Sequence, residues 1–269
     1  MKKYSIAFVL GMSLVCLGSA GAGEFSRPCE NEVATSPLSL SIRQRQWGTS
    51  ANPGPLRREL LRNGFAPGSP VLFRILKEAR HERRGVLEAW ILRKKRGQKG
   101  EFELFKKYPI VAWSGSLGPK LKEGDGQTPE GFYFIRAGQM NPLSHYHLSM
   151  DVGYPNPMDR SLGRTGSQIM IHGKNESRGC FAMGDEPIEE IYLLAEEALM
   201  NCVPEIPIFS FPFEMTSRNL DSNRESTWYS FWENLAEGSH LFDEYHLPPR
   251  VSVSHGRYSF QLLSIIADY

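Results

Sequence analysis

His172 and Cys180 are the two residues whose types and spacing best suit catalysis. His172 ends the apolar run at 169–171, Gly173 follows it, and Cys180 comes one short loop later. A cysteine attacks a carbonyl carbon as its thiolate, so it needs a base to take its proton, and imidazole is such a base. Gly173 lets the backbone turn sharply, so the imidazole can face the loop that carries Cys180. The pair predicts a cysteine enzyme.

The residues beside Cys180 can orient a substrate. Gly179 allows a substrate carbonyl to approach closely, and backbone amides at and near Cys180 can form an oxyanion hole. Ser177 can hydrogen-bond the loop or the substrate, and Arg178 can pair with a carboxylate. Both also have a simple structural interpretation, Ser177 as a turn former and Arg178 as a solvated charge. The expected reaction is acyl transfer, in which the thiolate expels an amine and water or a second amine releases the thioester.

His145 and His147 form a second cluster, on a run of alternating residues that predicts a strand with both rings on one face. Together with His172 and Cys180 they offer four zinc ligands, so a zinc hydrolase is an alternative. Nothing in the spacing demands a metal, and we expect neither a metal nor a cofactor. His147 is therefore a candidate substrate or orienting contact, and a purely structural role is its alternative.

Hydrophobic periodicity indicates the elements that must position these residues. We predict strands at residues 71–77, 86–92, 102–105, 108–114, 132–135, 146–152, 168–172, 206–213 and 250–254. Charged turns separate the first three, which therefore predict a β-meander. Helices are predicted at residues 55–63, 185–200 and around 228–232, the second with Asp185 as its N-cap and the third ended by Gly238. The expected fold is mainly β with flanking helices, in the α+β class.

The amino terminus has the pattern of a secretory signal. Lys2 and Lys3 precede an apolar run at 6–17, and the small residues after it include the cleavage pattern of Ala20 and Ala22. The run has about a dozen residues and is shorter than the roughly 20 needed to span a bilayer. We therefore expect residues 1–22 to be removed. An uncleaved anchor and lipid attachment at Cys16 are the alternatives.

The number of cysteines also bears on whether the protein is secreted. Of the four cysteines, Cys16 would leave with the signal, and an odd number would enter an oxidising compartment. A disulfide between Cys29 and Cys202 would leave Cys180 as a free thiol, which suits a nucleophile. The alternative is that Cys29 and Cys202 are both buried and reduced.

The composition limits the partners. The chain has 269 residues, of which 41% are hydrophobic, so it can bury one sizeable core. Its 31 Lys and Arg residues nearly cancel its 30 Asp and Glu residues. No global charge therefore directs the protein to nucleic acid or to an anionic membrane.

Several motifs together resemble a known family. Residues 169–183, with Thr128, Pro129, Glu130 and Gly131 before a strand, resemble the L,D-transpeptidase catalytic domain of the YkuD family. In that family a His followed by Gly or Ser precedes a nucleophile motif of Ser or Thr, any residue, Gly and Cys. More narrowly, the YafK-like branch of the family is similar at residues 113–115, 118–126, 150–156 and 209–216.

The resemblance implies a periplasmic enzyme that acts on peptidoglycan peptide stems, at an L,D bond next to meso-diaminopimelate. Family members make crosslinks or anchor lipoproteins, and some relatives hydrolyse such linkages. Carried over by motif, Cys180 is the nucleophile, His172 its base, and the Gly173 carbonyl orients the imidazole. Many members have His where this chain has Arg178, and the interval from His to Cys is shorter here than in many. The acceptor therefore stays open.

The expected organisation has four parts, which are a signal peptide at 1–22, a lead-in at 23–70, the catalytic domain at 71–216 and a C-terminal appendage at 217–269. The expected partners are peptidoglycan stems and a peptidoglycan-linked lipoprotein. One rival interpretation is a hydrolase that releases such a lipoprotein. The other is a non-catalytic cell-wall-binding module that retains the motif.

Overall fold

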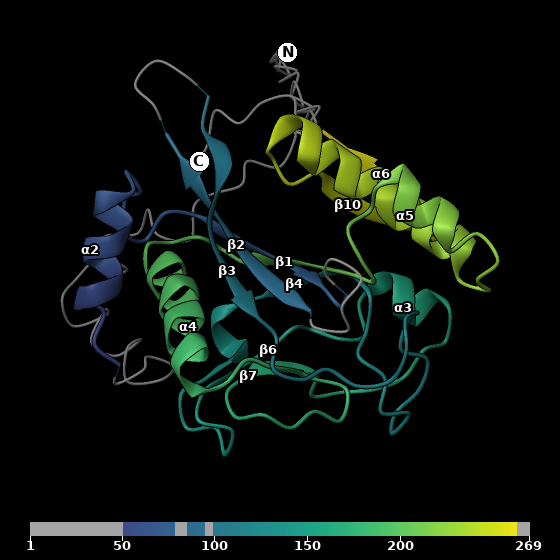
Figure 1. The fold of residues 1–269 in the computed structure, drawn as a ribbon, viewed down its shortest axis with the longest axis horizontal. Coiled ribbons are helices and arrows are strands. Elements are labelled where there is room, and N and C mark those ends of the chain that lie inside the picture. Colours follow the sequence, from purple (N-terminus) through teal and green to yellow (C-terminus); the bar gives the residue numbers. More distant parts are fainter. Residues whose placement is uncertain (1–50, 79–84, 95–98, 263–269) are drawn as a thin grey trace, which may run out of the picture.

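A five-stranded sheet, called the central sheet below, forms the middle of the molecule (Figure 1). In this computed structural model, residues 51–78, 85–94 and 99–262 are described. The strands are β1 (Val71–Leu76), β2 (Val86–Arg93), β3 (Glu101–Pro109), β4 (Gly131–Ile135) and β9 (Ile206–Phe211). Their order is β3-β2-β1-β9-β4, so the predicted meander of the first three is confirmed.

Strand β1 is buried on both faces because successive side chains of a strand point to opposite sides. Val71, Phe73 and Ile75 contribute to one hydrophobic core, which includes helix α4 (Asp185–Met200). Leu72 and Leu76 contribute to a second core, which includes helix α6 (Tyr229–Tyr245). The central sheet therefore lies between two layers, as Figure 1 shows.

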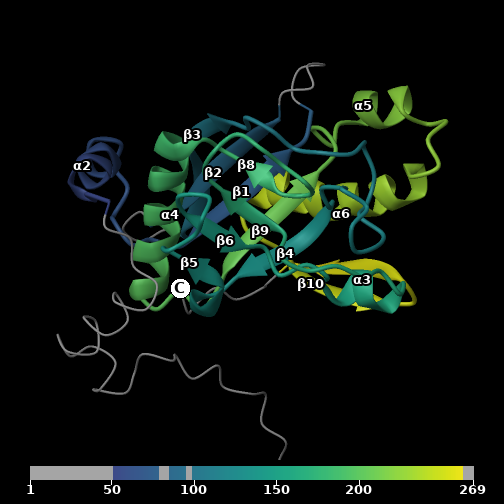
Figure 2. The ribbon, with the colours of Figure 1, turned by 90° about the horizontal axis from the view of Figure 1, so that it is seen from below.

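The first layer contains a smaller sheet and helix α4 (Asp185–Met200), visible together in Figure 2. This small sheet consists of β5 (Met140–Asn141), β6 (Ser149–Asp151), β7 (Met170–His172) and β8 (Phe181–Ala182), in that order. Helix α4 contacts β1, β6 and β7. Two short helical elements, η1 (Ala137–Gln139) and α3 (Pro157–Ser161), flank β5 and β6 along the chain. The small sheet is thereby fixed against the main core.

Helix α2 (Gly54–Arg62) belongs to the same packed unit. Leu56 and Leu60 are buried in the core that contains α4. The side chain of Arg57 forms an ion pair with Glu197 of α4, with a distance of 2.7 Å between Nε and Oε1. The predicted helix over 55–63 is therefore present and docked.

The second layer comes from the C-terminal part of the chain. It contains α5 (Ser217–Ser222), α6 (Tyr229–Tyr245) and a hairpin of β10 (Arg250–Ser254) and β11 (Arg257–Gln261). The prediction that Gly238 ends the helix is wrong, because α6 continues to Tyr245. A side chain at position 238 would lie 2.4 Å from Phe260 and 2.6 Å from Phe132. The glycine at this position lets Phe260 and Phe132 pack closely against the helix.

Four further predictions differ from the structure. The strand expected over 108–114 ends at Pro109, and the strand expected over 146–152 is limited to β6. His147 instead has a left-handed backbone with a φ of 71°, so the prediction that His145 and His147 share a strand face is wrong. Gly184, not Asp185, precedes the first helical residue of α4. The Asp185 carboxylate accepts a hydrogen bond from the Lys174 amide at 2.8 Å.

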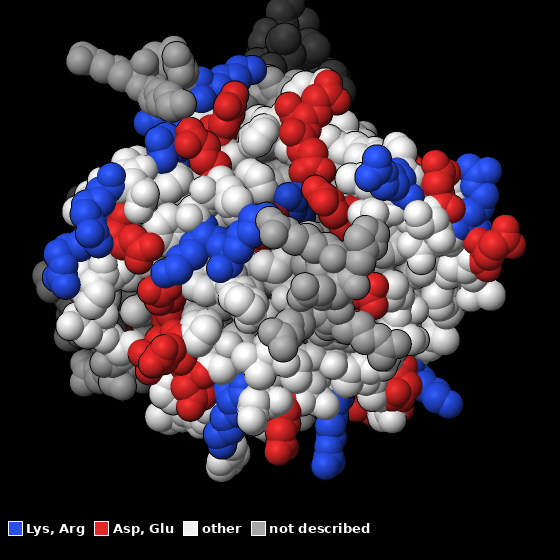
Figure 3. Space-filling model, viewed as in Figure 1, with Lys and Arg blue, Asp and Glu red and all other residues white. Residues whose placement is uncertain are grey.

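Charges of both signs are interspersed over the face shown in Figure 3, as the nearly balanced composition implies. Among the described residues, none of the helices combines the length and the apolar character that crossing a bilayer requires. The predicted signal at 1–22 and Cys29 lie outside the described residues. Cys202 is disulfide-bonded and Cys180 is a free thiol.

Candidate active site

Strands β7 and β8 bring His172 and Cys180 to one face of the small sheet. The two strands are parallel, with Ile171 opposite Phe181, and both of these side chains are buried in the main core. Side chains alternate along a strand, so His172 and Cys180 point away from that core. The Met170 amide donates a hydrogen bond to the Cys180 Sγ at 3.4 Å. The structure therefore brings together the pair that the sequence singles out.

The Gly173 carbonyl orients the His172 imidazole. Nδ1 of His172 lies 2.6 Å from the Gly173 oxygen, and because a carbonyl oxygen only accepts, Nδ1 carries the proton. Nε2 of the neutral ring is then the basic nitrogen, and within the described residues it makes no hydrogen bond. Burial lowers the pKa of His172, and the bond to Gly173 partly offsets this. The imidazole is thus neutral and ready to accept a proton at neutral pH.

The Cys180 thiol is protonated in the resting site. Burial raises its pKa, and the bond from the Met170 amide only partly opposes this. Asp151 raises the pKa further, whereas Lys120 lowers it. The structure therefore does not favour a thiolate already formed at rest. A thiol in this state can act as a nucleophile only if a base takes its proton.

Hydrogen bonds from three side chains hold the loop that carries Cys180. The Gly179 amide donates to Ser114 Oγ at 2.6 Å. The Cys180 carbonyl accepts from Ser177 Oγ at 2.8 Å and from Thr128 Oγ1 at 3.3 Å. Ser177 therefore bonds the loop itself, and the Gly179 amide is engaged by Ser114 instead of pointing at an oxyanion. Gly179 has a φ of 114°, a conformation that favours glycine.

The close approach of neighbouring groups leaves room only for glycine at position 173. A side chain there would lie 2.7 Å from both the Tyr146 carbonyl and the Asp185 carboxylate. The Tyr146 ring packs against the His172 ring with 4.6 Å between centroids. The Lys174 ammonium lies 5.7 Å from the centre of the Tyr146 ring and also donates to the His145 carbonyl. The turn at 145–147 thus covers one side of the imidazole.

Comparisons with known proteins identify the family. Residues 95–201 match the L,D-transpeptidase catalytic domain, named YkuD. The chain is 36% identical over 211 residues to "Putative L,D-transpeptidase YafK" of Escherichia coli (strain K12), covering 78% of this chain and 81% of that protein. The protein of the same name from Escherichia coli O157:H7 gives the same values. This chain belongs to the L,D-transpeptidase family.

Two solved structures are weakly similar to this chain. The helical cell shape determining protein Pgp2 from Campylobacter jejuni is 18% identical with a TM-score of 0.39, over 73% of this chain and 79% of that one. A point mutant of Pgp2 is 20% identical with a TM-score of 0.40, over 68% of this chain and 62% of that one. Similarity at this level does not bear on function.

The remaining predicted site residues of this family member lie around the pair. His147 Nε2 lies 2.8 Å from Glu189 Oε1 of α4, which ties the ring to that helix. Arg178 is exposed on the loop before Cys180. Among the residues that the structure describes, there is no group of three His, Cys, Asp or Glu side chains that could hold a metal ion. His145, His147, His172 and Cys180 therefore do not form the zinc site considered above.

Sequence reasoning missed three residues that surround the pair, namely Ser114, Tyr146 and Asp151. Thr128 has a sequence signal only as part of the motif at 128–131. Ser114 is the last residue of an expected strand and Asp151 lies within another, so neither has a local signal of its own. Tyr146 lies between two histidines, which are the residue type that suggests a metal ligand. Only the strand register of the small sheet reveals Asp151, which is paired with Met170.

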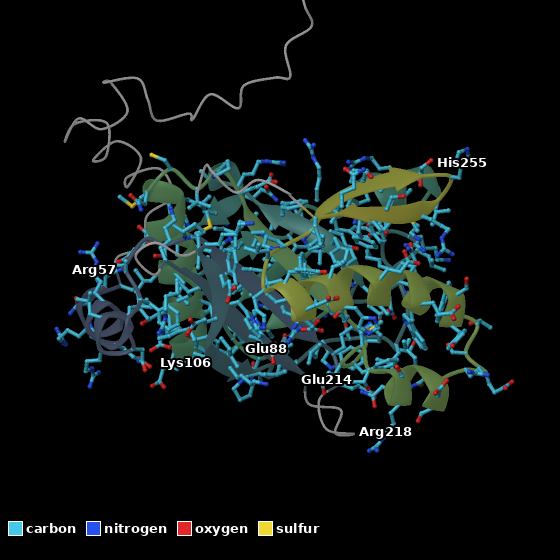
Figure 4. All side chains as sticks on the ribbon, turned by 90° about the horizontal axis from the view of Figure 1, so that it is seen from above. Arg57, Glu88, Lys106, Glu214, Arg218 and His255 are labelled. Atoms are coloured by element: carbon cyan, nitrogen blue, oxygen red, sulfur yellow. The ribbon has the colours of Figure 1, made fainter. Side chains whose placement is uncertain are left out.

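A cavity of about 660 Å³ lies elsewhere, on the α6 side of the central sheet. Glu88, Glu214 and Arg218, labelled in Figure 4, are among its lining residues. The Glu88 carboxylate is buried and accepts hydrogen bonds or ion pairs from Arg74 at 2.8 Å and Lys107 at 2.7 Å. Neither His172 nor Cys180 lines this cavity, so it is separate from the candidate site.

Proposed function

We propose that the protein is a periplasmic cysteine enzyme that acts on peptidoglycan peptide stems at an L,D bond next to meso-diaminopimelate. The observation that carries this proposal is the placement of Cys180 and His172 on one sheet face, with the imidazole oriented by the Gly173 carbonyl at 2.6 Å. Membership of the L,D-transpeptidase family supports the kind of substrate. The proposed periplasmic location follows from that substrate and from the signal pattern at 1–22.

In the first half of the proposed reaction, the Cys180 sulfur attacks the scissile carbonyl carbon while its proton passes to His172 Nε2. The resulting tetrahedral intermediate collapses with cleavage of the carbon–nitrogen bond. The His172 imidazolium gives its proton to the leaving amine, and a thioester remains on Cys180. Because the imidazole starts neutral, no ion pair has to exist before the substrate binds.

In the second half, an amine or water attacks the thioester carbon and gives a proton to His172 Nε2. The carbon–sulfur bond breaks, and the departing Cys180 sulfur recovers that proton. An amine acceptor forms a new crosslink or a lipoprotein anchor, whereas water releases a free stem. Transfer and hydrolysis thus share the thioester and differ only in the acceptor.

The test uses purified mature protein and isolated sacculi, with and without bound lipoprotein. Wild-type protein and the Cys180→Ala variant are incubated with each, and released and retained muropeptides are analysed by mass spectrometry. New diaminopimelate links that require Cys180 establish transfer. Loss of existing links with free diaminopimelate ends, again requiring Cys180, establishes hydrolysis. If neither preparation changes in a Cys180-dependent way, the proposal fails and a wall-binding module is the better interpretation.

A further inference from the structure

A fully buried lysine joins the two ends of the segment at 114–130. Lys77 follows strand β1, and its side chain is 0% exposed. Its ammonium donates to the carbonyls of Ser116 at 2.8 Å and Thr128 at 3.0 Å, and to Glu130 Oε1 at 2.9 Å. One cation thereby draws together the start and the end of a long loop.

Glu130 connects that loop to the C-terminal helix α6. Its Oε1 accepts from the Gly118 amide at 2.7 Å, and its Oε2 accepts from Trp232 Nε1 at 2.8 Å. Trp228, just before α6, packs so closely that a side chain at Gly118 would lie 2.4 Å from its indole nitrogen. The segment at 114–130 is thus held by β1 on one side and by α6 on the other.

The same segment holds the loop of the nucleophile. Ser114 Oγ accepts from the Gly179 amide at 2.6 Å, and Thr128 Oγ1 donates to the Cys180 carbonyl at 3.3 Å. Thr128 Oγ1 also accepts from the Ser114 amide at 3.0 Å. A continuous set of hydrogen bonds therefore runs from Trp232, through Glu130 and Lys77, to the residues that fix Cys180.

Stability alone is a weak reason for a buried ion pair, because moving both charges out of water offsets most of their attraction. The pair of Lys77 and Glu130 is completely buried, and both of its members also bind backbone groups of the segment. We propose that Lys77, Glu130 and Trp232 are positioning residues for Cys180, so that α6 is part of the catalytic unit. This inference rests on the proposed role of Cys180 as nucleophile.

The variant that tests it is Trp232→Phe, which removes one donor from Glu130 and keeps a large ring. Trp90→Phe is the matched control, because Trp90 Nε1 donates to the buried Glu88 at 3.1 Å. Its acceptor Glu88 lines the cavity described above and is not part of the loop of Cys180. Both tryptophans are buried, with 2% of Trp232 and 9% of Trp90 exposed.

Two readouts need no substrate, namely amide exchange in peptides that cover 177–181 and the pH profile of Cys180 alkylation by iodoacetamide. In Trp232→Phe we expect about tenfold faster exchange there, the scale of one lost hydrogen bond. We also expect the alkylation midpoint to move to lower pH, because a loosened loop exposes the buried thiol to water. Trp90→Phe should leave both unchanged. Equal effects in the two variants, or none in Trp232→Phe, would overturn the proposal.

A second pair of variants acts closer to the loop. Thr128→Val removes the hydroxyl that contacts the Cys180 carbonyl and should behave as Trp232→Phe does, whereas Thr128→Ser keeps the hydroxyl and should behave as wild type. With an active wild-type enzyme, both Trp232→Phe and Thr128→Val should lower kcat about tenfold at unchanged KM. Unchanged kcat despite a loosened loop would contradict a positioning role. An inactive wild type would instead count against the proposed function, while exchange and alkylation still decide the inference.

Discussion

Asp151 lies on the same face of the small sheet as Cys180, because it is paired with Met170, whose amide donates to the Cys180 thiol. The carboxylate raises the pKa of the thiol, since a nearby negative charge disfavours a thiolate. One Asp151 oxygen accepts from the Gly153 amide at 2.7 Å. The surroundings of Cys180 therefore favour its protonated thiol.

Replacing Asp151 tests this relationship. In Asp151→Asn the negative charge is lost, so the pKa of Cys180 should fall and more thiolate should exist at a given pH. The alkylation profile of Cys180 should then move to lower pH. Asp221→Asn, which removes an exposed carboxylate on α5, controls for net charge and should leave the profile in place. An unmoved profile in Asp151→Asn would contradict the assigned electrostatics.

The pH dependence of thioester formation follows from the two shifted groups. The pKa of His172 is lowered and that of Cys180 is raised, so the thiol and the neutral imidazole coexist over a wide range. We expect a flat rate from about pH 8 down to about pH 6.5, with a fall only below the ordinary histidine value. Rates are measured by intact mass at early times. A fall that is already complete at neutral pH would contradict a neutral resting imidazole.

Tyr146 is expected to keep the His172 pKa low by covering the ring. Tyr146→Ala exposes the imidazole to water, which favours its charged form and raises its pKa toward the usual range. The acidic limb of the rate profile should then move to higher pH. Tyr146→Phe keeps the ring that packs at 4.6 Å and should retain the wild-type profile. Identical profiles for the two variants would show that the ring does not act in this way.

Gly173 tests the packing around the base. In Gly173→Ala the new methyl group would meet the Tyr146 carbonyl and the Asp185 carboxylate at 2.7 Å. We expect a loss of about 1–3 kcal/mol in the free energy of unfolding, the usual cost of overpacking. Gly138→Ala is the control, because nothing lies within 4 Å of a side chain there. Equal stability of the two variants in urea unfolding would refute the close contact.

The parts of the fold that could be predicted have a strong local pattern. The meander of β1 to β3 and helix α4 show clear periodicity. The short spacing between His172 and Cys180 suffices to predict that these two residues form a pair. Strands β5 and β8 have two residues each, too few to show an alternation. Helix α6 runs through Gly238, and the glycine is there because Phe260 approaches the helix backbone closely. That contact joins segments that are distant in sequence, so the local pattern does not reveal it.

The same limit applies to the site. The bonds from Ser114 and Thr128 to residues 179–180 join segments that are far apart in sequence. The burial that raises the pKa of Cys180 and lowers that of His172 also depends on packing between elements. The sequence indicates the candidate pair of His172 and Cys180, whereas the resting protonation of the two groups requires the structure.

The most direct test of the central claim is to trap the thioester. Mature protein is mixed with a tetrapeptide stem that contains meso-diaminopimelate, quenched in acid at short times, and analysed by intact mass and peptide mapping. We predict an added mass equal to the acyl part of the stem, located on Cys180, removed by hydroxylamine and absent in Cys180→Ala. Stem turnover without any such adduct, or an adduct that persists in Cys180→Ala, would contradict covalent catalysis by Cys180.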